Sequence, residues 1–557
     1  MNARDSSGEI STGYARAVDA LVIGAGFAGP YALHRLRLLG FTAHAIEAAP
    51  GVGGTWYWNR YPGARVDIES QDYSFSFSDE LEAEWAWTER YAAQPELLRY
   101  AGHVADRFDL RRDISFETRV AAMRFGDDGR WVAEMNTGEL VSARYVIAAT
   151  GCLSVPKQVD IAGADSFAGV SVHTGRWPED GLNLTGQRVG IIGTGSSGIQ
   201  CITEVAKQAG KLSVFQRTAN FSVPAHNAPL APDQAEAWKA DRHRHRQRAR
   251  ESHLGTSSLV RSERSALTTP PDERTAEFDR RWAQGGFQMS AAFNDIVSSP
   301  AANAHAVEFV AAKIRAVVSD PAVAEALVPK AYPFGTRRLC VDTGYYETFN
   351  RDNVTLVDVA ADPIVAIEPD GVRTAAGFHP LDVLIHAVGF DAMTGALLAI
   401  DIEGADGVTL RNAWAAGPRS YLGLMVAGFP NLFTVTGPGS PSVFSNMILS
   451  IEQHVEWITA CIDDLRRDGL DRIEPAVAAQ DGWVDHVNAV ADTTLLPLTD
   501  SWYTGSNIAG KPRVLMPYLA GVGVYRQVCA DVVANGYRGF VITASAPTRR
   551  AAVVSAS

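Results

Sequence analysis

The chain has 557 residues, a formal net charge of −13, a hydrophobic fraction of 46% and a charged fraction of 20%. This length and composition predict a soluble protein of two or three domains, and the negative charge argues against a nucleic-acid or anionic-membrane partner. No apolar run could span a bilayer, the first residues lack a signal peptide's apolar core, and the five cysteines are scattered without a C-x-x-C pair. We therefore expect a cytoplasmic protein without a metal site or redox disulfide, with a monomer as the working assumption.

A strand–turn–helix–strand unit follows residues 1–17, a polar segment that we expect to be a flexible tail. Val18–Ile23 has the composition of a buried strand and leads into a glycine-rich turn. Leucines at helical spacing then predict a helix, and the next strand ends at Glu47. The glycines of the G-x-G-x-x-G turn, which let backbone amides approach a pyrophosphate, are Gly24, Gly26 and Gly29.

The same pattern recurs from Arg188–Ile192 onward, where a strand, a second glycine turn, a helix and a strand ending at Gln216 follow one another. Two such units predict an α/β fold with two doubly wound, Rossmann-like dinucleotide-binding domains. The residues of this second turn that we expect to hold a pyrophosphate are Gly193, Thr194, Gly195, Ser196, Ser197 and Gly198.

The two units differ at the residue that ends their second strand. Glu47 can accept a hydrogen bond from a ribose 2′-hydroxyl, which FAD offers. The equivalent position in the second unit is Gln216, followed by Arg217 and Thr218. A cation in place of an acid is typical of a ribose 2′-phosphate, so the second turn predicts NADP, with Arg337 as a further phosphate partner.

The domain boundaries follow from these units. A segment rich in Ala, Arg and Glu predicts a helical insertion, in which Arg242–Arg250 has arginine at every second position and is interpreted as a solvated helix. We expect an FAD-binding domain in residues 18–151 and 389–542, an NADP-binding domain in residues 152–227 and 331–388, the insertion in residues 228–330, and a second flexible tail in residues 543–557.

An aromatic segment, Gly53–Asp67, comes after the first unit and reads GGTWYWNRYPGARVD. Flat side chains and glycines at close range suit packing around an isoalloxazine ring. The expected flavin contacts are Gly54, Thr55, Trp56 and Asp67, with Tyr73 in the D-I-E-S-x-x-Y segment that follows.

The linker between the two units has the spacing F-x-G-x-x-x-H-x-x-x-W-P, carried by Phe167, Gly169, His173, Trp177 and Pro178. This spacing and the G-G-x-W-x-x-x-x-[F/Y]-P-G-x-x-x-D pattern of the aromatic segment resemble the type I Baeyer–Villiger monooxygenases. Similar stretches, among them GTGSSGIQ, VFQRT, GPGSPSVFSNM and SWYTGSN, extend the resemblance from about residue 18 to residue 542.

The resemblance implies an enzyme that binds FAD, oxidises NADPH and uses O₂ to insert one oxygen beside a ketone carbonyl, giving an ester or lactone through an anionic C4a-peroxyflavin. It implies that Arg338 is the cation beside the peroxide, that Asp67 holds Arg338, and that Trp502 contacts the nicotinamide cofactor. Arginine suits this role because it is not neutralised at working pH. The implied substrate-pocket candidates are Ser442, Val443, Phe444 and Met447.

Peroxide attack on a ketone needs a cation, so we interpret His173 as a hydrogen-bonding anchor in a hinge and not as an acid or base. Phe444 stands where relatives more often carry a smaller aliphatic residue, which leads to the hypothesis of altered access for bulky ketones. Two departures from the family pattern, Val388 in place of threonine and Cys152, affect the expected cofactor geometry locally.

Two other functions stay open from the sequence. A flavin-containing N- or S-oxygenating monooxygenase shares the two glycine turns, although Trp177, Asp67 and Arg338 argue against it. A non-catalytic flavoprotein would not need Asp67 and Arg338. A disulfide reductase is excluded because the chain has no cysteine pair.

Overall fold

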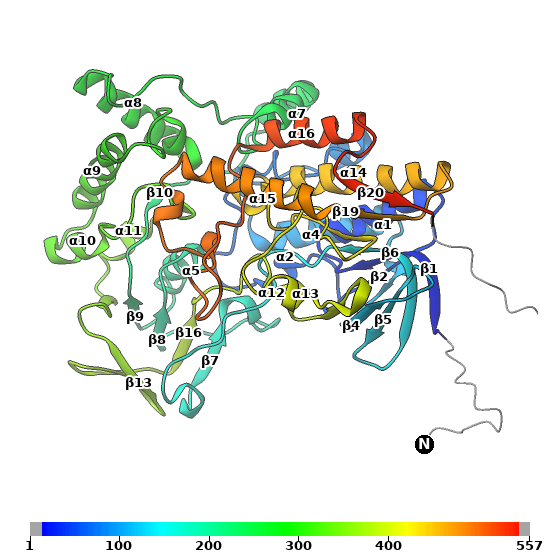
Figure 1. Cartoon of the computed structure of the whole chain (residues 1–557). Helices are drawn as coiled ribbons and strands as arrows, with labels where there is room; N and C mark the ends of the chain where they lie inside the picture. The colour runs from blue at the N-terminus through cyan, green and yellow to red at the C-terminus, as the bar shows by residue number, and fades with distance from the viewer. Residues whose placement is uncertain (1–13, 545–557) are drawn as a thin grey trace, which may run out of the picture.

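The computed structural model describes residues 14–544 (Figure 1). The larger of its sheets contains strands from both halves of the chain. Its order is β17 (Asp401–Glu403), β4 (Val120–Phe125), β5 (Trp131–Met135), β6 (Leu140–Ala148), β1 (Arg16–Ile23), β2 (Ala43–Ile46) and β3 (Ile114–Ser115), with β18 (Leu432–Thr434) also paired to β6. The pairs formed by β1 with β2 and with β6 are parallel, and only β5 runs antiparallel to its neighbours.

The second large sheet is parallel throughout and carries the second glycine turn. Its order is β12 (Val354–Asp358), β9 (Lys211–Gln216), β8 (Arg188–Ile192), β16 (Val383–His386) and β7 (Val170–His173). Residues 14–544 also contain three small sheets: β10 (Ser222–Pro224) with β11 (Cys340–Asp342); β13 (Ile364–Glu368), β14 (Gly371–Thr374) and β15 (Phe378–Pro380); and β19 (Arg472–Pro475) with β20 (Phe540–Thr543).

Helices cover both sheets. The first unit's helix α1 (Ala28–Leu38) packs on the long helix α14 (Met447–Arg467), and the second unit's helix is α5 (Ser196–Val205). Leu33 and Leu36 of α1 and Ile199 and Ile202 of α5 are buried, as their helical spacing predicts. The remaining helices outside the insertion are α2 (Thr55–Trp58), α3 (Asp79–Glu84), α4 (Gln94–Arg107), α11 (Tyr345–Thr348), α12 (Gly395–Leu398), α13 (Leu410–Ala413), α15 (Val477–Asp492) and α16 (Val522–Ala534).

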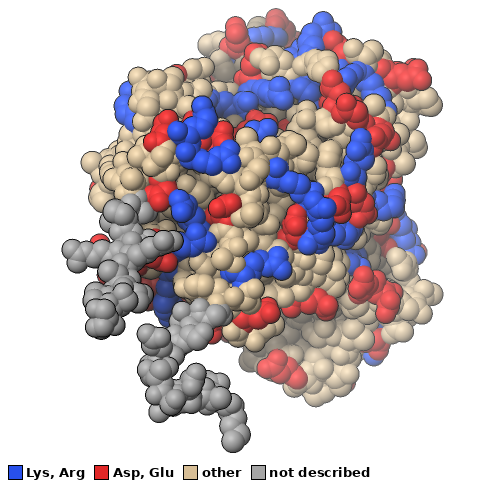
Figure 2. Space-filling model, turned by 90° about the vertical axis from the view of Figure 1, so that its right-hand side faces the viewer, with Lys and Arg blue, Asp and Glu red and all other residues tan. Residues whose placement is uncertain are grey.

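The predicted α/β class with two doubly wound units is confirmed. Both predicted tails are wrong at their inner ends. β1 begins at Arg16 and the Ala15 amide bonds to Leu140 O, while Thr543 is the last residue of β20; residues 1–13 and 545–557 lie outside the described range. Within residues 14–544 no helix is both long enough and apolar enough to cross a bilayer. On the face shown in Figure 2, basic and acidic side chains alternate and form no patch of one sign.

The region 228–330 contains the helices α6 (Pro232–Ala240), α7 (Arg242–Glu251), α8 (Pro271–Gln284), α9 (Pro300–Val317) and α10 (Pro321–Leu327). The interpretation of Arg242–Arg250 as a solvated helix is wrong at Arg246, which is only 5% exposed. Its Nε and Nη2 bond to Glu82 Oε1 at 2.8 and 2.7 Å, and Nη2 also bonds to Ser74 Oγ. Charge periodicity fails here because a buried acid of α3 pairs most closely with one arginine of the run.

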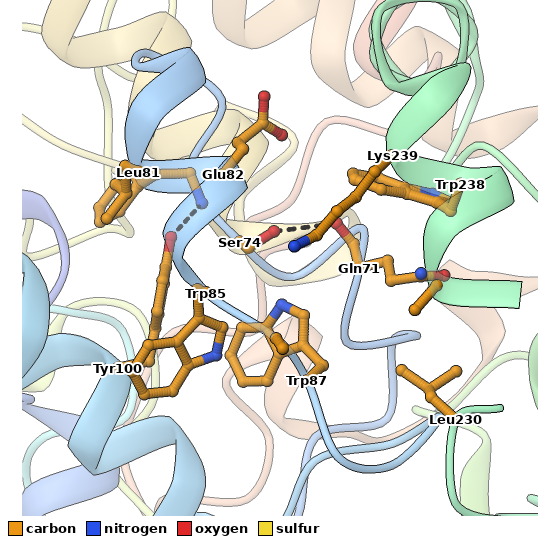
Figure 3. A pocket seen from close by; sticks show the side chains of 13 residues that line it. Gln71, Ser74, Leu81, Glu82, Trp85, Trp87, Tyr100, Leu230, Trp238 and Lys239 are labelled. Carbon is orange, nitrogen blue, oxygen red and sulfur yellow. Dashed lines mark hydrogen bonds between the residues drawn. The ribbon is translucent and has the colours of Figure 1, made fainter. Parts of the chain in front are cut away.

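A small pocket lies where α6 meets α3 and the chain that follows it (Figure 3). Trp85, Trp87 and Tyr100 line one side and Trp238 lines another. Its volume is about 30 Å³, which is room for roughly two water molecules. We therefore treat it as a packing gap at the base of the insertion.

Candidate active site

The first glycine turn requires glycine for steric reasons. Gly24 has φ +103°, and a Cβ there would lie 2.5 Å from Ala149 O; a Cβ on Gly29 would lie 1.9 Å from Gly24 O. Gly26 faces Gly54, whose Cα would be 3.5 Å from an added Cβ. The tight packing of strand, turn and helix leaves the backbone amides at the helix N-terminus free to face a ligand.

Glu47 follows β2 and lines the cavity next to this turn. Its Oε2 accepts the Ala25 amide at 2.6 Å and its Oε1 accepts the Ala49 amide at 2.7 Å. Burial raises the pKa of Glu47, and these two hydrogen bonds oppose the rise. Each oxygen keeps a second lone pair, so the carboxylate can still accept a hydrogen bond from a hydroxyl.

The second turn repeats this design. Gly193 has φ +108° and a Cβ there would lie 2.5 Å from Ala387 O, while a Cβ on Gly198 would lie 2.2 Å from Gly193 O. Gly195 has open space around its added Cβ. Thr194 Oγ1 donates to Thr218 O at 3.0 Å and joins the turn to the end of β9. The middle glycine therefore presents bare backbone in the direction from which a ligand would approach.

Cations without acidic partners stand beside the second turn. Arg217 is exposed just after β9, and the Arg337 guanidinium lies 4.2 Å from the ring centre of Tyr332. Among residues 14–544, neither arginine forms an ion pair with a carboxylate. Gln216, by contrast, is buried and donates to Ala326 O at 2.8 Å, which ties it to α10.

A cavity of about 460 Å³ lies between the two glycine turns. Both units contribute to it, so it is the place where the two nucleotide sites converge. Among the residues that line it are Gly24, Gly26, Glu47, Gly54, Thr55, Trp56, Asp67, Tyr73, Cys152, Ser196, Ser197, Arg338 and Trp502.

Arg338 and Asp67 form a bidentate ion pair in this cavity. Arg338 Nε donates to Asp67 Oδ2 at 2.9 Å and Nη2 donates to Oδ1 at 2.7 Å, while Nη1 donates to Val443 O at 2.8 Å. Burial lowers the pKa of the Arg338 guanidinium, but the charge of Asp67 and the contacts with Tyr503 raise it above its usual value. Arg338 therefore stays charged at every working pH and its orientation is set by three hydrogen bonds.

Aromatic side chains enclose the same space. Trp56 Nε1 donates to Tyr73 OH at 3.2 Å, and burial raises the pKa of Tyr73 to about 12. Trp502 packs on Tyr503 with ring centres 4.2 Å apart. Sequence reasoning did not select Tyr503, although its position beside Trp502 in the SWYTGSN stretch could have indicated it.

The four pocket candidates separate into two groups. Val443 and Met447 line the cavity. Ser442 does not line the cavity; it is fully buried, and its hydroxyl donates at 2.9 Å to the main-chain oxygen of Thr436, which does line it. Phe444 packs edge-on against His253 and Tyr503 at 5.7 and 6.4 Å between ring centres.

The two departures from the family pattern lie in different places: Cys152 lines the cavity, whereas Val388 packs against the hydrophobic core that contains Ile192 and Phe215. Cys152 Sγ is 3.2 Å from Ser442 Oγ, and burial raises the pKa of the thiol, which keeps it protonated. Thr436 also lines the cavity, with φ +56°. Sequence reasoning missed Thr436, since a left-handed threonine has no local sequence signal.

The linker packs into the second sheet. Phe167 and Trp177 are buried, Pro178 is exposed, and a Cβ on Gly169 would lie 2.3 Å from Asp382 O. His173 ends β7, and its Nδ1 accepts the Gly175 amide at 2.9 Å. Gly175 lines the cavity, whereas His173 packs edge-on against Phe390 behind it.

Two doubly wound units that converge on one cavity define an oxidoreductase with two dinucleotide sites. A family model described as pyridine nucleotide-disulphide oxidoreductase matches residues 21–295. A Baeyer–Villiger monooxygenase from Pseudooceanicola batsensis is 43% identical over 528 residues, 94% of this chain and 96% of that protein. The phenazine N-monooxygenase PhzNO1 from Lysobacter antibioticus is 41% identical over 94% of this chain and 97% of that protein.

Among solved structures, an oxidized steroid monooxygenase bound to NADP matches with a TM-score of 0.91 and 50% identity, covering 95% of this chain and 99% of that one. The chain belongs to the family of the Baeyer–Villiger monooxygenases.

Proposed function

We propose that this protein is an FAD-containing Baeyer–Villiger monooxygenase that uses NADPH and O₂ to insert one oxygen next to a ketone carbonyl, giving an ester or lactone. The observation that carries the proposal is the Arg338–Asp67 pair in a cavity bordered by both glycine turns. Its partners are a small-molecule ketone and O₂. All five cysteines are free and buried, which supports a reducing, cytoplasmic setting, with a monomer as the working form.

The residues present fit both cofactors. FAD would lie along the cavity, with its pyrophosphate at Gly24–Gly29, a ribose hydroxyl on Glu47, and the flavin ring beside Gly54, Trp56 and Tyr73. NADP would lie at the second turn, where Gly195 leaves the backbone bare. Arg217 and Arg337 would bind its 2′-phosphate, because neither forms an ion pair with a carboxylate among residues 14–544.

When bound and reduced by NADPH, FAD supplies the chemistry that transfers one atom of O₂ to the ketone. The chain contributes charge and position. Arg338 holds a permanent positive charge at the cavity wall, where it stabilises negative charge that develops on the ketone oxygen. Asp67 orients the guanidinium through two hydrogen bonds, and Trp502 forms part of the cavity wall.

The linker Phe167–Pro178 acts as a hinge in this proposal. It joins an FAD-binding domain, residues 18–151 and 389–542, to an NADP-binding domain that includes residues 152–227 and 331–388. Burial of Phe167 and Trp177 anchors both ends of the hinge. His173 fixes the turn whose Gly175 borders the cavity, so movement of the second domain would change the cavity shape.

Oxygenation of nitrogen or sulfur is the second candidate function, and the similarity to a phenazine N-monooxygenase favours testing it. Electrophilic oxygen transfer to an amine needs no fixed cation, whereas attack on a carbonyl does. The buried, fully oriented Arg338 therefore supports the ketone reaction as the main activity.

The test is a product screen by mass with the purified yellow holoenzyme. NADPH, O₂ and a panel of aryl, cyclic and steroid ketones are offered beside matched amines and sulfides. We expect esters or lactones one oxygen heavier than their ketones. N-oxides or sulfoxides without any ester would overturn the proposal in favour of the second candidate.

A further inference from the structure

Three segments that are distant in the sequence meet behind the cavity wall at Asp72. The amide and hydroxyl of Ser257 donate to Asp72 Oδ2 at 2.8 and 3.1 Å. Asn446 Nδ2 donates to Asp72 O at 2.7 Å and to Gly255 O at 3.1 Å, and the Asn446 amide donates to Leu254 O at 2.8 Å. We name this group, Asp72, Asn446 and the loop Ser252–Ser257, the clamp.

The clamp connects the helical insertion to two walls of the cavity at once. Tyr73, the neighbour of Asp72, lines one wall, and Met447, the neighbour of Asn446, lines another. Asn446 also caps α14, because its Oδ1 accepts the Ile448 amide at 3.1 Å. The loop Ser252–Ser257 is therefore hydrogen-bonded to Asp72 and Asn446, which are directly adjacent in sequence to the wall residues Tyr73 and Met447.

The two side chains that join the loop of the clamp to the cavity walls are buried. Asp72 and Asn446 are 2% and 1% exposed. Asp72 Oδ1 has no hydrogen-bond partner within residues 14–544, so the Asp72 carboxylate depends on Ser257 for its side-chain hydrogen bonds. Burial raises the pKa of Asp72 to about 6, against the hydrogen bonds from Ser257 and the charge of Arg246. A carboxyl group in such a place destabilises the fold unless its partners are held in position.

We propose that Asp72 is a positioning residue through which the loop Ser252–Ser257 sets the separation of the cavity walls at Tyr73 and Met447, and with it the size of ketone that the cavity accepts. This inference rests on the proposed function, since it assumes that the substrate is a ketone. A shift of about 1 Å in a wall changes rates by up to about 10²-fold, because reacting atoms must be within a narrow distance.

The test compares Asp72→Ala and Asp72→Asn with the parent holoenzyme, using kcat/KM for a bulky and a small ketone. Asparagine keeps an acceptor for Ser257, so Asp72→Asn should stay near the parent ratio. Asp72→Ala removes the acceptor, and the bulky-to-small ratio should change by about 10-fold, the equivalent of one or two hydrogen bonds. The matched control is Asp295→Ala.

Asp295 makes the same kind of contact inside the insertion, accepting from Ser265 Oγ at 2.5 Å and from the Ala266 amide at 2.8 Å. It does not line the cavity. Asp295→Ala should lower the unfolding temperature without moving the ketone ratio. A ratio that moves equally in both variants reflects general loosening and overturns the proposal.

Hydrogen exchange on the holoenzyme gives a readout that does not depend on turnover. Asp72→Ala should lose protection at the amides of Ser257 and Asn446, and Asp295→Ala should not. If Asp72→Ala does not fold, Ser257→Ala removes one of the two bonds to Oδ2, and a change of about threefold in the ratio is expected.

Lost protection with an unmoved ratio, or unmoved protection, overturns the inference while leaving the proposed function intact. A parent enzyme that makes no ester from any ketone overturns the proposed function, and the inference with it.

Discussion

Arg338 and Asp67, from different halves of the chain, face each other in parallel, with Nε–Oδ2 and Nη2–Oδ1 distances of 2.9 and 2.7 Å. The side chains are 18% and 25% exposed, so the pair is largely removed from water yet open to the cavity. Such a pair combines strong charge with fixed direction. It places a cation that cannot be neutralised at the point where two nucleotide sites converge.

Arg338→Ala should separate the two halves of the reaction. Reduction of the flavin by NADPH should continue, whereas ester formation should fall by about 10²–10³-fold, the usual effect of removing an electrostatic catalyst. Stopped-flow reduction and product mass measure the two steps. The control is Arg373→Ala, since Arg373 makes an exposed bidentate pair with Glu368 at 2.8 and 3.1 Å. Ester formation at the parental rate in Arg338→Ala would contradict the assignment.

Arg246→Ala should destabilise the protein strongly, because it removes the closer of the two arginines that pair with the buried Glu82 and leaves Arg242 at the longer distance of 3.8 Å. The side chains of Arg246 and Glu82 are 6% and 4% exposed, and breaking a buried pair from one side costs about 3–5 kcal/mol of unfolding free energy. Chemical denaturation followed by tryptophan fluorescence measures this. Arg244 of the same helix pairs with Asp241 at the surface, so Arg244→Ala should cost no more than about 1 kcal/mol. Equal effects would show that the insertion is not held by Arg246.

The sequence predicts local features of this fold better than contacts between distant segments. Each glycine turn is local, because its strands, its helix and the close contacts that require glycine belong mostly to one strand–turn–helix–strand unit. Both turns were predicted correctly. The burial of Arg246 depends on Glu82, 164 residues away, and the contact of Asn446 with Asp72 spans 374 residues. Neither partner has a pattern of its own. Resemblance indicated Arg338 because a whole family shares its surroundings.

Acid should destabilise the fold through buried histidines. Burial lowers the pKa of His44, His253 and His386 to about 4 and that of His454 to about 3. The unfolded chain takes up protons below pH 6.5 while the folded chain does not, so stability is full above 6.5 and falls as the pH drops toward these lowered values. His454 alone should remove about 2 kcal/mol between pH 7 and pH 5.

His454→Asn tests this contribution. The Thr436 amide donates to His454 Nδ1 at 2.8 Å, and an asparagine oxygen can replace that acceptor without titrating. The variant should lose less stability than the parent between pH 7 and pH 5 in denaturation series. His243, whose side chain is 74% exposed, gives the control His243→Asn, which should keep the parental slope. A slope that is unchanged in His454→Asn would contradict the prediction.

His173→Ala should damage coupling and leave flavin binding intact. The histidine fixes the Gly175 amide and lies behind the cavity, so its loss loosens the hinge without removing a flavin contact. We expect full flavin absorbance, turnover lower by about 10-fold and less ester per NADPH consumed, because a small displacement of the cavity wall at Gly175 would misplace the reacting groups.

His173→Asn keeps the acceptor for Gly175 and should recover most of the rate. His379 packs edge-on against Phe215 at 5.3 Å, much as His173 packs on Phe390 at 5.7 Å. It lies on β15, outside the cavity lining, so His379→Ala controls for the loss of a histidine–phenylalanine contact alone. Loss of the flavin from His173→Ala would show that the residue belongs to the cofactor site and not to a hinge.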